Sequence, residues 1–452
     1  MNYREFFKGK RMTVMGLGLL GRGVGDAEII ASCDATVTVT DKKDADVLAE
    51  SVERLKGKDV VFHLGGHDLK DFTNTDMVIK AAGVPLDSSE ITAARDAGVP
   101  VSMSTALAAK FAFEMGATIV GVTGTRGKTT VAHMIYHVLK RAAPRRSSGR
   151  ERRAFLGGNI RGISTLALLP DVQKGDVLVL ELDSWQLQGF GDLKMSPHVA
   201  VFTNFMPDHL NYYAGDMEAY FADKANVFKH QNAGDFLFVG SGVAERVEAA
   251  RPPLKAVVPP AVPSDWKLAI PGEHNRENAS LGAAALRALG LTEDEIKTGL
   301  ESFVGVEGRL QFVREVNGVK IYNDNNATTP EATIAALRAL GGIKKDIVLI
   351  VGGDDKGLDM SALVQEIPHW CSGVVLFKER GTDRIRDDVF ATSQQGVQVF
   401  EEDGLAATIK RAVALARQGE ILLYSPAFSS FGAYFKNEFD RNDQFLKIVQ
   451  SL

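Results

Sequence analysis

Short apolar runs alternate with longer segments of helical periodicity along the whole chain, and this alternation restricts the fold more than any other feature. Such alternation is typical of βαβ units, in which parallel strands are joined through helices. The runs form three groups, which start with "MTVM" at residue 12, "TIVGVTG" at residue 118 and "VKIYND" at residue 319. At roughly 150 residues per domain, a chain of 452 residues agrees with three α/β domains. We expect domains over residues 1–115, 116–308 and 309–452.

Charge and cysteine content argue against several classes of protein. The net charge of −5 gives no general attraction to nucleic acid or to anionic membranes, so we expect neither as a partner. The chain has no stretch of about 18 apolar residues and its charged N-terminus lacks a signal region, so we expect no membrane insertion. Cys33 and Cys371 lie far apart without metal-ligand spacing. We expect a cytoplasmic protein that acts on small molecules.

A first glycine-rich loop, "GLGLLGRG", directly follows the first predicted strand. Gly16, Gly18 and Gly21 have GxGxxG spacing, which lets backbone N–H groups approach a diphosphate at a helix N-terminus. Asp41 ends the next predicted strand, where an acidic side chain would reach a ribose or a base. The pattern fits NAD, FAD or another nucleotide diphosphate, and it also fits a tight turn without a ligand.

A second glycine-rich loop, "GVTGTRGKTT", follows the strand predicted at residue 118. It differs from the phosphate-binding pattern GxxxxGK[ST] because Gly121 comes one residue early. Backbone amides of such a loop cradle phosphates, Lys128 would neutralise the β- and γ-phosphates, and Thr129 would reach Mg²⁺. We therefore predict an ATP site formed by Gly124, Thr125, Gly127, Lys128, Thr129 and Thr130.

Three further segments have two interpretations each. Glu181 ends the strand in "VLVLELDSWQLQ", where it is either an ordinary strand-end residue or a hard oxygen ligand for Mg²⁺. Asn275 and Asn278 have i, i+3 spacing at a predicted helix start, which suits either adenine binding or helix capping. The arginine-rich segment 140–155 suits either a clamp for an anionic substrate or a solvated loop, and we favour the loop.

The loop variant GxxGTxGKTT resembles the ATP-binding loop of the Mur ligase and folylpolyglutamate synthetase superfamily. Other segments are similar to motifs of this family in the same order: "FLGGNIRG", "ELDSWQLQ", "TNFMPDHL", "PGEHNREN" and "GRLQFVREVNGVKIYNDNNATTPEA". The resemblance implies a Rossmann-like N-terminal domain, a central P-loop ATPase-like domain with a parallel sheet, and a C-terminal Rossmann-like domain. It also implies an enzyme, an ATP-dependent ligase that forms an amide through an acyl phosphate.

The resemblance assigns roles to individual residues. It implies that Glu181 and His209 bind metal together with Thr129, and that Lys224 is carbamylated and supports two Mg²⁺ ions, with Lys128 completing the catalytic set. Asn159 would lie near the sugar substrate. Asn275, Asn278, Arg309 and Asp324 would bind ATP, and Thr328, Lys356 and Ser430 would bind the carboxylate of an amino acid.

Within the family, the chain is most similar to the branch that adds D-glutamate to UDP-N-acetylmuramoyl-L-alanine in peptidoglycan precursor synthesis. The first glycine loop and Asp41 would then hold the UDP-sugar, and the second loop would hold ATP. We expect a monomer. The chain departs from the family pattern at Ala82, where proline is usual, at Arg126 in place of asparagine, and at Asn326 in place of lysine.

Other functions remain as alternatives. Another Mur ligase or a folylpolyglutamate synthetase-like ligase would use the same ATP loop with a different acceptor. An NAD-dependent oxidoreductase would use "GLGLLGRG" and leave the second loop unexplained. A sugar-nucleotide sensor without catalysis would not need the combination of Lys128, Glu181, His209 and Lys224.

Overall fold

The computed structural model describes residues 2–18, 21–142, 146–147, 150–209, 212–250, 252–342, 345–430 and 432–452. Part of the arginine-rich segment, residues 143–145, 148 and 149, therefore lies outside the described residues. Contacts divide the chain into two compact units. The first comprises Met1–Ser264 and Glu277–Leu300, and the second comprises Asp265–Arg276 and Glu301–Leu452.

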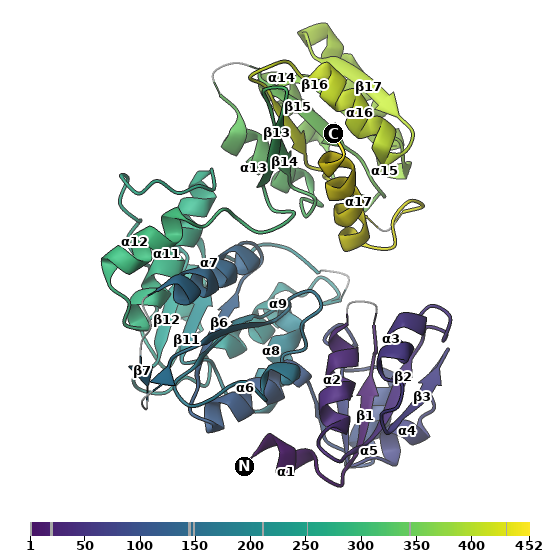
Figure 1. Ribbon diagram of the computed structural model, residues 1–452, viewed down its shortest axis with the longest axis vertical. Coiled ribbons are helices and arrows are strands. Elements are labelled where there is room, and N and C mark those ends of the chain that lie inside the picture. Colours follow the sequence, from purple (N-terminus) through teal and green to yellow (C-terminus); the bar gives the residue numbers. More distant parts are fainter. Residues whose placement is uncertain are drawn as a thin grey trace. The chain divides into compact units, whose positions relative to one another are not determined.

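The first unit begins with a parallel sheet of five strands in the order β3-β2-β1-β4-β5 (Figure 1). Strand β1 lies between β2 and β4, so the strand order reverses at β1. In sheets of this kind, ligands bind beside such a reversal, at the carboxyl ends of the strands. The elements are α1 (Tyr3–Phe7), β1 (Arg11–Met15), α2 (Arg22–Ala31), β2 (Thr36–Asp41), α3 (Ala49–Arg54), β3 (Val60–Leu64), α4 (Lys70–Thr73), β4 (Met77–Lys80), α5 (Ser89–Asp96), β5 (Val101–Ser102) and α6 (Ser104–Glu114).

A second parallel sheet in the same unit has the order β12-β11-β6-β10-β9. Its inner strands are buried along almost their whole length, as continuous apolar runs require when helices cover both faces. Helix α7 packs against β6, β9 and β10. The elements are β6 (Thr118–Thr123), α7 (Lys128–Arg141), β7 (Arg146–Ser147), β8 (Arg150–Glu151), β9 (Ala154–Gly158), β10 (Val177–Glu181), α8 (Ser184–Asp192), β11 (Val199–Phe202), α9 (Met217–Lys224), β12 (Phe236–Val239), α10 (Ala244–Ala249), α11 (Glu273–Ala288) and α12 (Glu293–Glu301). The first four residues of α11 and the last residue of α12 belong to the second unit.

The second unit contains a six-stranded sheet in the order β13-β14-β18-β15-β16-β17. The expectation of parallel pairing is wrong at one edge, because β13 pairs with β14 in the antiparallel direction. Asn317 and Gly318, both with positive φ, form the two-residue turn between these strands, a strong hairpin signal that our sequence analysis missed. The elements are β13 (Gln311–Val316), β14 (Val319–Asn323), α13 (Pro330–Leu340), β15 (Ile347–Val351), α14 (Ser361–Trp370), β16 (Cys371–Phe377), α15 (Arg380–Ala391), β17 (Gln398–Glu402), α16 (Leu405–Leu415), β18 (Ile421–Tyr424) and α17 (Glu438–Gln450).

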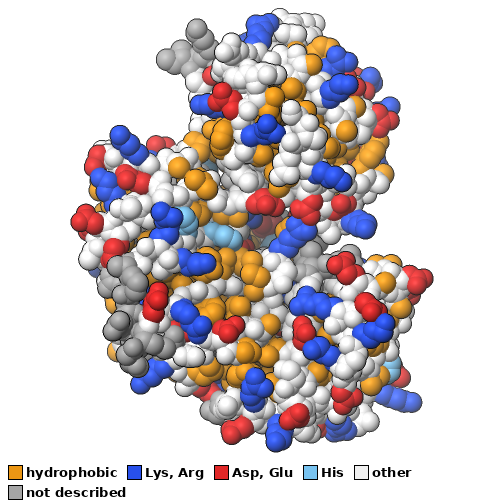
Figure 2. Space-filling model, viewed as in Figure 1, with side chains coloured by type: hydrophobic (Ala, Val, Ile, Leu, Met, Phe, Trp, Pro, Cys, Tyr) orange, Lys and Arg blue, Asp and Glu red, His pale blue; other side chains and the backbone are white. Residues whose placement is uncertain are grey.

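The predicted α/β class is confirmed, whereas the boundaries at residues 115 and 308 stay predictions. Cys33 and Cys371 are both buried in hydrophobic cores. On the face shown in Figure 2, basic and acidic side chains are interspersed. Among the described helices, none is long and apolar enough to cross a bilayer.

Candidate active site

The second glycine loop joins β6 to α7. Gly127 caps α7 with a φ of 82°, and Gly124 has a φ of 139°. A Cβ on Gly124 would overlap Thr203, and a Cβ on Gly127 would lie 2.5 Å from Oδ1 of Asn278. Only glycine fits both the backbone conformation and the space at these positions. The loop leads into the N-terminus of a 14-residue helix, the arrangement that binds phosphate.

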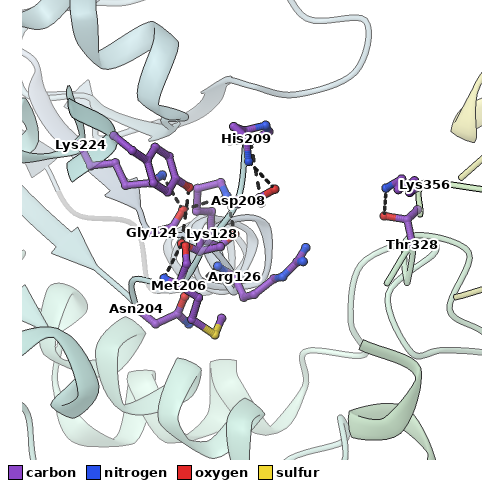
Figure 3. Close-up of polar contacts among 12 residues, drawn as sticks. Gly124, Arg126, Lys128, Asn204, Met206, Asp208, His209, Lys224, Thr328 and Lys356 are labelled. Atoms are coloured by element: carbon purple, nitrogen blue, oxygen red, sulfur yellow. Dashed lines mark hydrogen bonds and ion pairs between the residues drawn. The ribbon is translucent and has the colours of Figure 1, made fainter. Parts of the chain in front are cut away.

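Polar side chains hold the backbone of this loop in place (Figure 3). The Oγ1 of Thr125 donates to the carbonyl of Met206 at 3.1 Å, and the backbone N–H of Arg126 donates to Oδ1 of Asn204 at 2.8 Å. Asn204 was not predicted from the sequence, although it lies in the "TNFMPDHL" segment just after β11. Thr129 and Thr130 occupy the first turn of α7.

Two lysine side chains converge on one carbonyl of the loop. The Nζ of Lys128 donates to the carbonyl oxygens of Gly124 at 3.0 Å and Thr125 at 2.9 Å, and the Nζ of Lys224 donates to the same Gly124 oxygen at 2.9 Å (Figure 3). Lys224 is only 1% exposed, and its burial, helped by the nearby charge of Lys128, lowers the pKa of Lys224 well below its usual range. The surroundings of Lys224 therefore disfavour its ammonium form.

Glu181 and His209 belong to elements beside the loop. Glu181 ends β10, is 3% exposed, and stands opposite Val122 in the register of β10 with β6. Burial lowers the pKa of His209, so the ring stays neutral near pH 7, and it lies 4.7 Å from the Trp185 ring between centroids. Within the described residues, no three His, Cys, Asp or Glu side chains form a group that could hold a metal by themselves.

The first glycine loop is tied to Asp41. The backbone N–H of Gly18 donates to Oδ2 of Asp41 at 3.1 Å, and the N–H of Lys43 donates to Oδ1 at 2.9 Å. Asp41 therefore shapes the loop directly, and its contact with a ligand stays a prediction. Gly16 has a φ of 95°, and Gly21 caps α2 with a φ of 78°.

Asn159 contacts the helix that follows the first glycine loop. Its Oδ1 accepts a hydrogen bond of 2.8 Å from Nη1 of Arg22, the first residue of α2. Arg22 was not predicted from the sequence, because this contact joins residues 137 positions apart. The contact brings the "FLGGNIRG" segment to the predicted UDP-sugar loop.

The two asparagines of α11 have different surroundings. Asn278 lies against Gly127 of the second glycine loop, and its role in ATP binding stays a prediction. The Nδ2 of Asn275 donates to the carbonyl of Pro271 at 2.7 Å, a local contact at the helix start that agrees with the capping interpretation.

In the second unit, two of the predicted amino-acid ligands lie together. The Nζ of Lys356 donates to Oγ1 of Thr328 at 3.1 Å (Figure 3), while Ser430 is buried. Asp324 accepts hydrogen bonds from the N–H of Leu310 and the hydroxyl of Ser425, and its burial raises the pKa of Asp324 to about 7. The predicted ATP residue Arg309 is exposed.

Comparison with known proteins gives consistent matches along the chain. Residues 10–103 match the Mur ligase MurD-like N-terminal domain, residues 122–252 the Mur ligase middle domain, and residues 308–428 the glutamate ligase domain of Mur ligases. The UDP-N-acetylmuramoylalanine–D-glutamate ligase of Roseiflexus sp. is 34% identical, with 98% of this chain and 99% of the relative covered. The enzyme of the same name from Ligilactobacillus salivarius is 30% identical, with 100% and 98% covered.

Solved structures share the fold at lower identity. The UDP-N-acetylmuramate-alanine ligase MurC of Thermotoga maritima has a TM-score of 0.61 at 18% identity, covering 98% of this chain and 99% of that one. The MurF ligase of the same organism, solved in complex with ADP, has a TM-score of 0.57 at 18% identity, covering 92% and 94%.

Proposed function

The chain belongs to the Mur ligase family, and from this premise we propose that it joins D-glutamate to UDP-N-acetylmuramoyl-L-alanine while ATP is converted to ADP and phosphate. The observation that carries the proposal is the pair of lysines on the Gly124 carbonyl, in a chain 34% identical over nearly its full length to a D-glutamate ligase. The buried thiols fit a reducing cytoplasm as the place of the reaction.

The chemistry needs an activated acyl group, because a carboxylate is a poor acyl donor. A carboxylate oxygen of the UDP-sugar attacks the γ-phosphorus of ATP, and the bond from that phosphorus to ADP breaks. Lys128 lies at the N-terminus of α7, where its ammonium stabilises the charge of the transferring phosphoryl group. The amine of D-glutamate then attacks the acyl phosphate, and phosphate leaves as the amide forms.

The residues around the loop fit Mg²⁺ as part of this site. Mg²⁺ is usually held by one or two carboxylates together with substrate phosphates, so a protein cage of three acids is not needed. The Thr129 hydroxyl, the Glu181 carboxylate and a carbamate on Lys224 would supply hard oxygen ligands, and neutral His209 would supply nitrogen. The ions, two by resemblance, would offset phosphate charge when bound.

The surroundings of Lys224 support the proposed carbamylation. A neutral amine adds CO₂ and loses a proton to become a carbamate anion, whereas an ammonium cannot react in this way. The lowered pKa of Lys224 increases the share of the neutral amine, and the neighbouring charge of Lys128 favours the anionic product.

Substrate positions follow from the two glycine loops and the second unit. We place the uridine diphosphate at Gly16, Gly18 and Gly21, beside Asp41 and Asn159. ATP would lie on the second loop with Asn275, Asn278, Arg309 and Asp324. Lys356, Thr328 and Ser430 would bind a D-glutamate carboxylate, since an ammonium and hydroxyl groups are suitable donors for it.

A panel of acceptor amino acids tests the proposal. Purified protein with UDP-N-acetylmuramoyl-L-alanine and Mg-ATP should release phosphate with D-glutamate, and mass spectrometry should detect the added residue. L-glutamate, L-lysine and diaminopimelate serve as competing acceptors. Selective turnover with one of these would assign the chain to another ligase of the family. Tight NADH binding without any phosphate release would instead support an oxidoreductase.

A further inference from the structure

The turn that follows β4 lies beside the first glycine loop. Lys80 at the end of β4 pairs in register with Met15 at the end of β1, so the two segments leave adjacent strands at the same edge of the sheet. The N–H of Ala81 donates to the carbonyl of Met15 at 2.9 Å, and a Cβ on Gly16 would lie 2.8 Å from that of Ala81. The conformation of this turn therefore limits where the glycine loop lies.

Residues 81–84 form a four-residue turn, closed by a 3.1 Å hydrogen bond from the N–H of Val84 to the carbonyl of Ala81. Ala82 is the second residue of the turn, the position where proline fixes φ near the required value. Alanine leaves that angle unrestrained. In the described residues the N–H of Ala82 donates to no backbone acceptor, so proline would fit this position without breaking a backbone hydrogen bond.

The side chain of Lys80 folds over the same turn. Its Nζ is within hydrogen-bond distance of the carbonyl oxygens of Ala81 at 3.4 Å, Ala82 at 3.2 Å and Val84 at 2.9 Å. The side chain is 2% exposed, so water does not compete well for these hydrogen bonds. An ammonium has three protons to donate, and here three carbonyls of one turn receive them.

Acidic groups on the neighbouring sheet's helices attract the same ammonium. Burial has the largest effect and lowers the pKa of Lys80 to about 8. Asp183 and Asp192 of the α8 segment and Asp223 of α9 oppose this shift by favouring the charged form, while Arg95 adds to it. The described part of the chain contains no ion pair with Lys80 closer than 4.0 Å, so the carbonyl groups remain its direct partners. The carbonyl oxygens of the turn therefore hold the Lys80 ammonium directly, and the three acidic groups add a longer-range attraction.

We infer that Lys80 is a positioning residue for the UDP-sugar: its ammonium restrains the turn at residues 81–84, as a proline at position 82 would, and thereby fixes the adjacent glycine loop. The inference rests on the proposed function for the identity of the ligand. The restraint itself depends only on the contacts of Lys80. Lys80 touches no reacting atom, so its loss should weaken binding of the sugar nucleotide more than it slows the reaction at saturation.

The test combines Lys80→Met with Ala82→Pro in the full-length protein, with Lys110→Met on α6 as a matched control. Lys80→Met should raise the KM for UDP-N-acetylmuramoyl-L-alanine about tenfold. This factor corresponds to the conformational entropy of roughly one backbone residue, which the variant would have to order when the substrate binds. The KM for ATP and kcat should change less than about twofold, because the ATP site is distant from Lys80 and distant sites are usually independent. The double variant should return the sugar-nucleotide KM to near the wild-type value.

Hydrogen exchange measures the restraint independently of activity. The peptide that contains residues 81–86 should exchange faster in Lys80→Met than in wild type or Lys110→Met, and Ala82→Pro should slow it again. Unchanged exchange in Lys80→Met would overturn the inference, as would failure of Ala82→Pro to restore it. If exchange behaves as expected but no UDP-sugar binds, the proposed function fails while the role of Lys80 in the turn stands.

Discussion

Lys224 shows how a single residue can acquire its chemistry from burial. A side chain that is 1% exposed and lies near the charge of Lys128 is poorly suited to remain an ammonium. We expect Lys224→Ala to be folded but nearly inactive, because it cannot form the proposed anionic carbamate. Millimolar acetate or formate should partly restore phosphate release by occupying the vacated position, whereas Lys229→Ala should behave as wild type. A fully active Lys224→Ala variant would contradict the assignment.

Lys80 makes the free energy of unfolding depend on pH, and the sign of this dependence follows from the direction of its pKa shift. Burial lowers the pKa of Lys80 to about 8 in the folded chain, whereas an unfolded lysine has its ordinary pKa near 10.5. Between these values the unfolded chain binds more protons, so this residue makes the free energy of unfolding rise with pH, by up to roughly 3 kcal/mol. Chemical denaturation at pH 7.5, 9 and 10 should show this rise in wild type relative to Lys80→Met. Parallel curves for the two proteins would disprove it.

At the scale of elements, α7 carries a lysine at each end. Lys128 begins the helix at the second glycine loop, where we propose that phosphate binds, and Lys140 lies in the last turn. Lys128→Ala should lower kcat at least about 100-fold, by analogy with removal of one charge-stabilising donor. Lys140→Ala changes the same charge on the same helix and should leave kcat within about twofold, as expected of a surface change far from the reaction. Steady-state phosphate release separates the two; equal effects would exclude a specific role for Lys128.

Elements were predictable where local chemistry dictates them. Glycine spacing after an apolar run predicted both loops, and the strand ends at Asp41 and Glu181 are confirmed. The antiparallel β13–β14 pair was missed, although the Asn317–Gly318 turn signalled it locally. The contact of Arg22 with Asn159 could not be predicted, because it depends on how two sheets pack together. The local sequence pattern thus predicts which residues lie in loops and at strand ends, whereas tertiary packing determines which of them contact one another.

At the scale of the whole molecule, the candidate site residues are shared between two compact units. Lys128 and Lys224 belong to the first unit, while Thr328 and Lys356 belong to the second. Lys356→Ala should therefore raise the KM for D-glutamate at least about tenfold, since a charge-assisted hydrogen bond to a carboxylate is lost. The KM for ATP should hardly change, and Lys378→Ala should affect neither. A selective rise in the KM for ATP would contradict the assignment of Lys356 to the amino-acid site.

The burial of both thiols makes this chain convenient for spectroscopy. Cys33 and Cys371 are 3% and 0% exposed, and burial raises the pKa of each thiol, so maleimide dyes should leave them unlabelled. Lys56→Cys and Asp388→Cys would place one dye on an exposed position in each unit without removal of the native cysteines. Single-molecule energy transfer between these dyes would then follow the distance between the units during turnover.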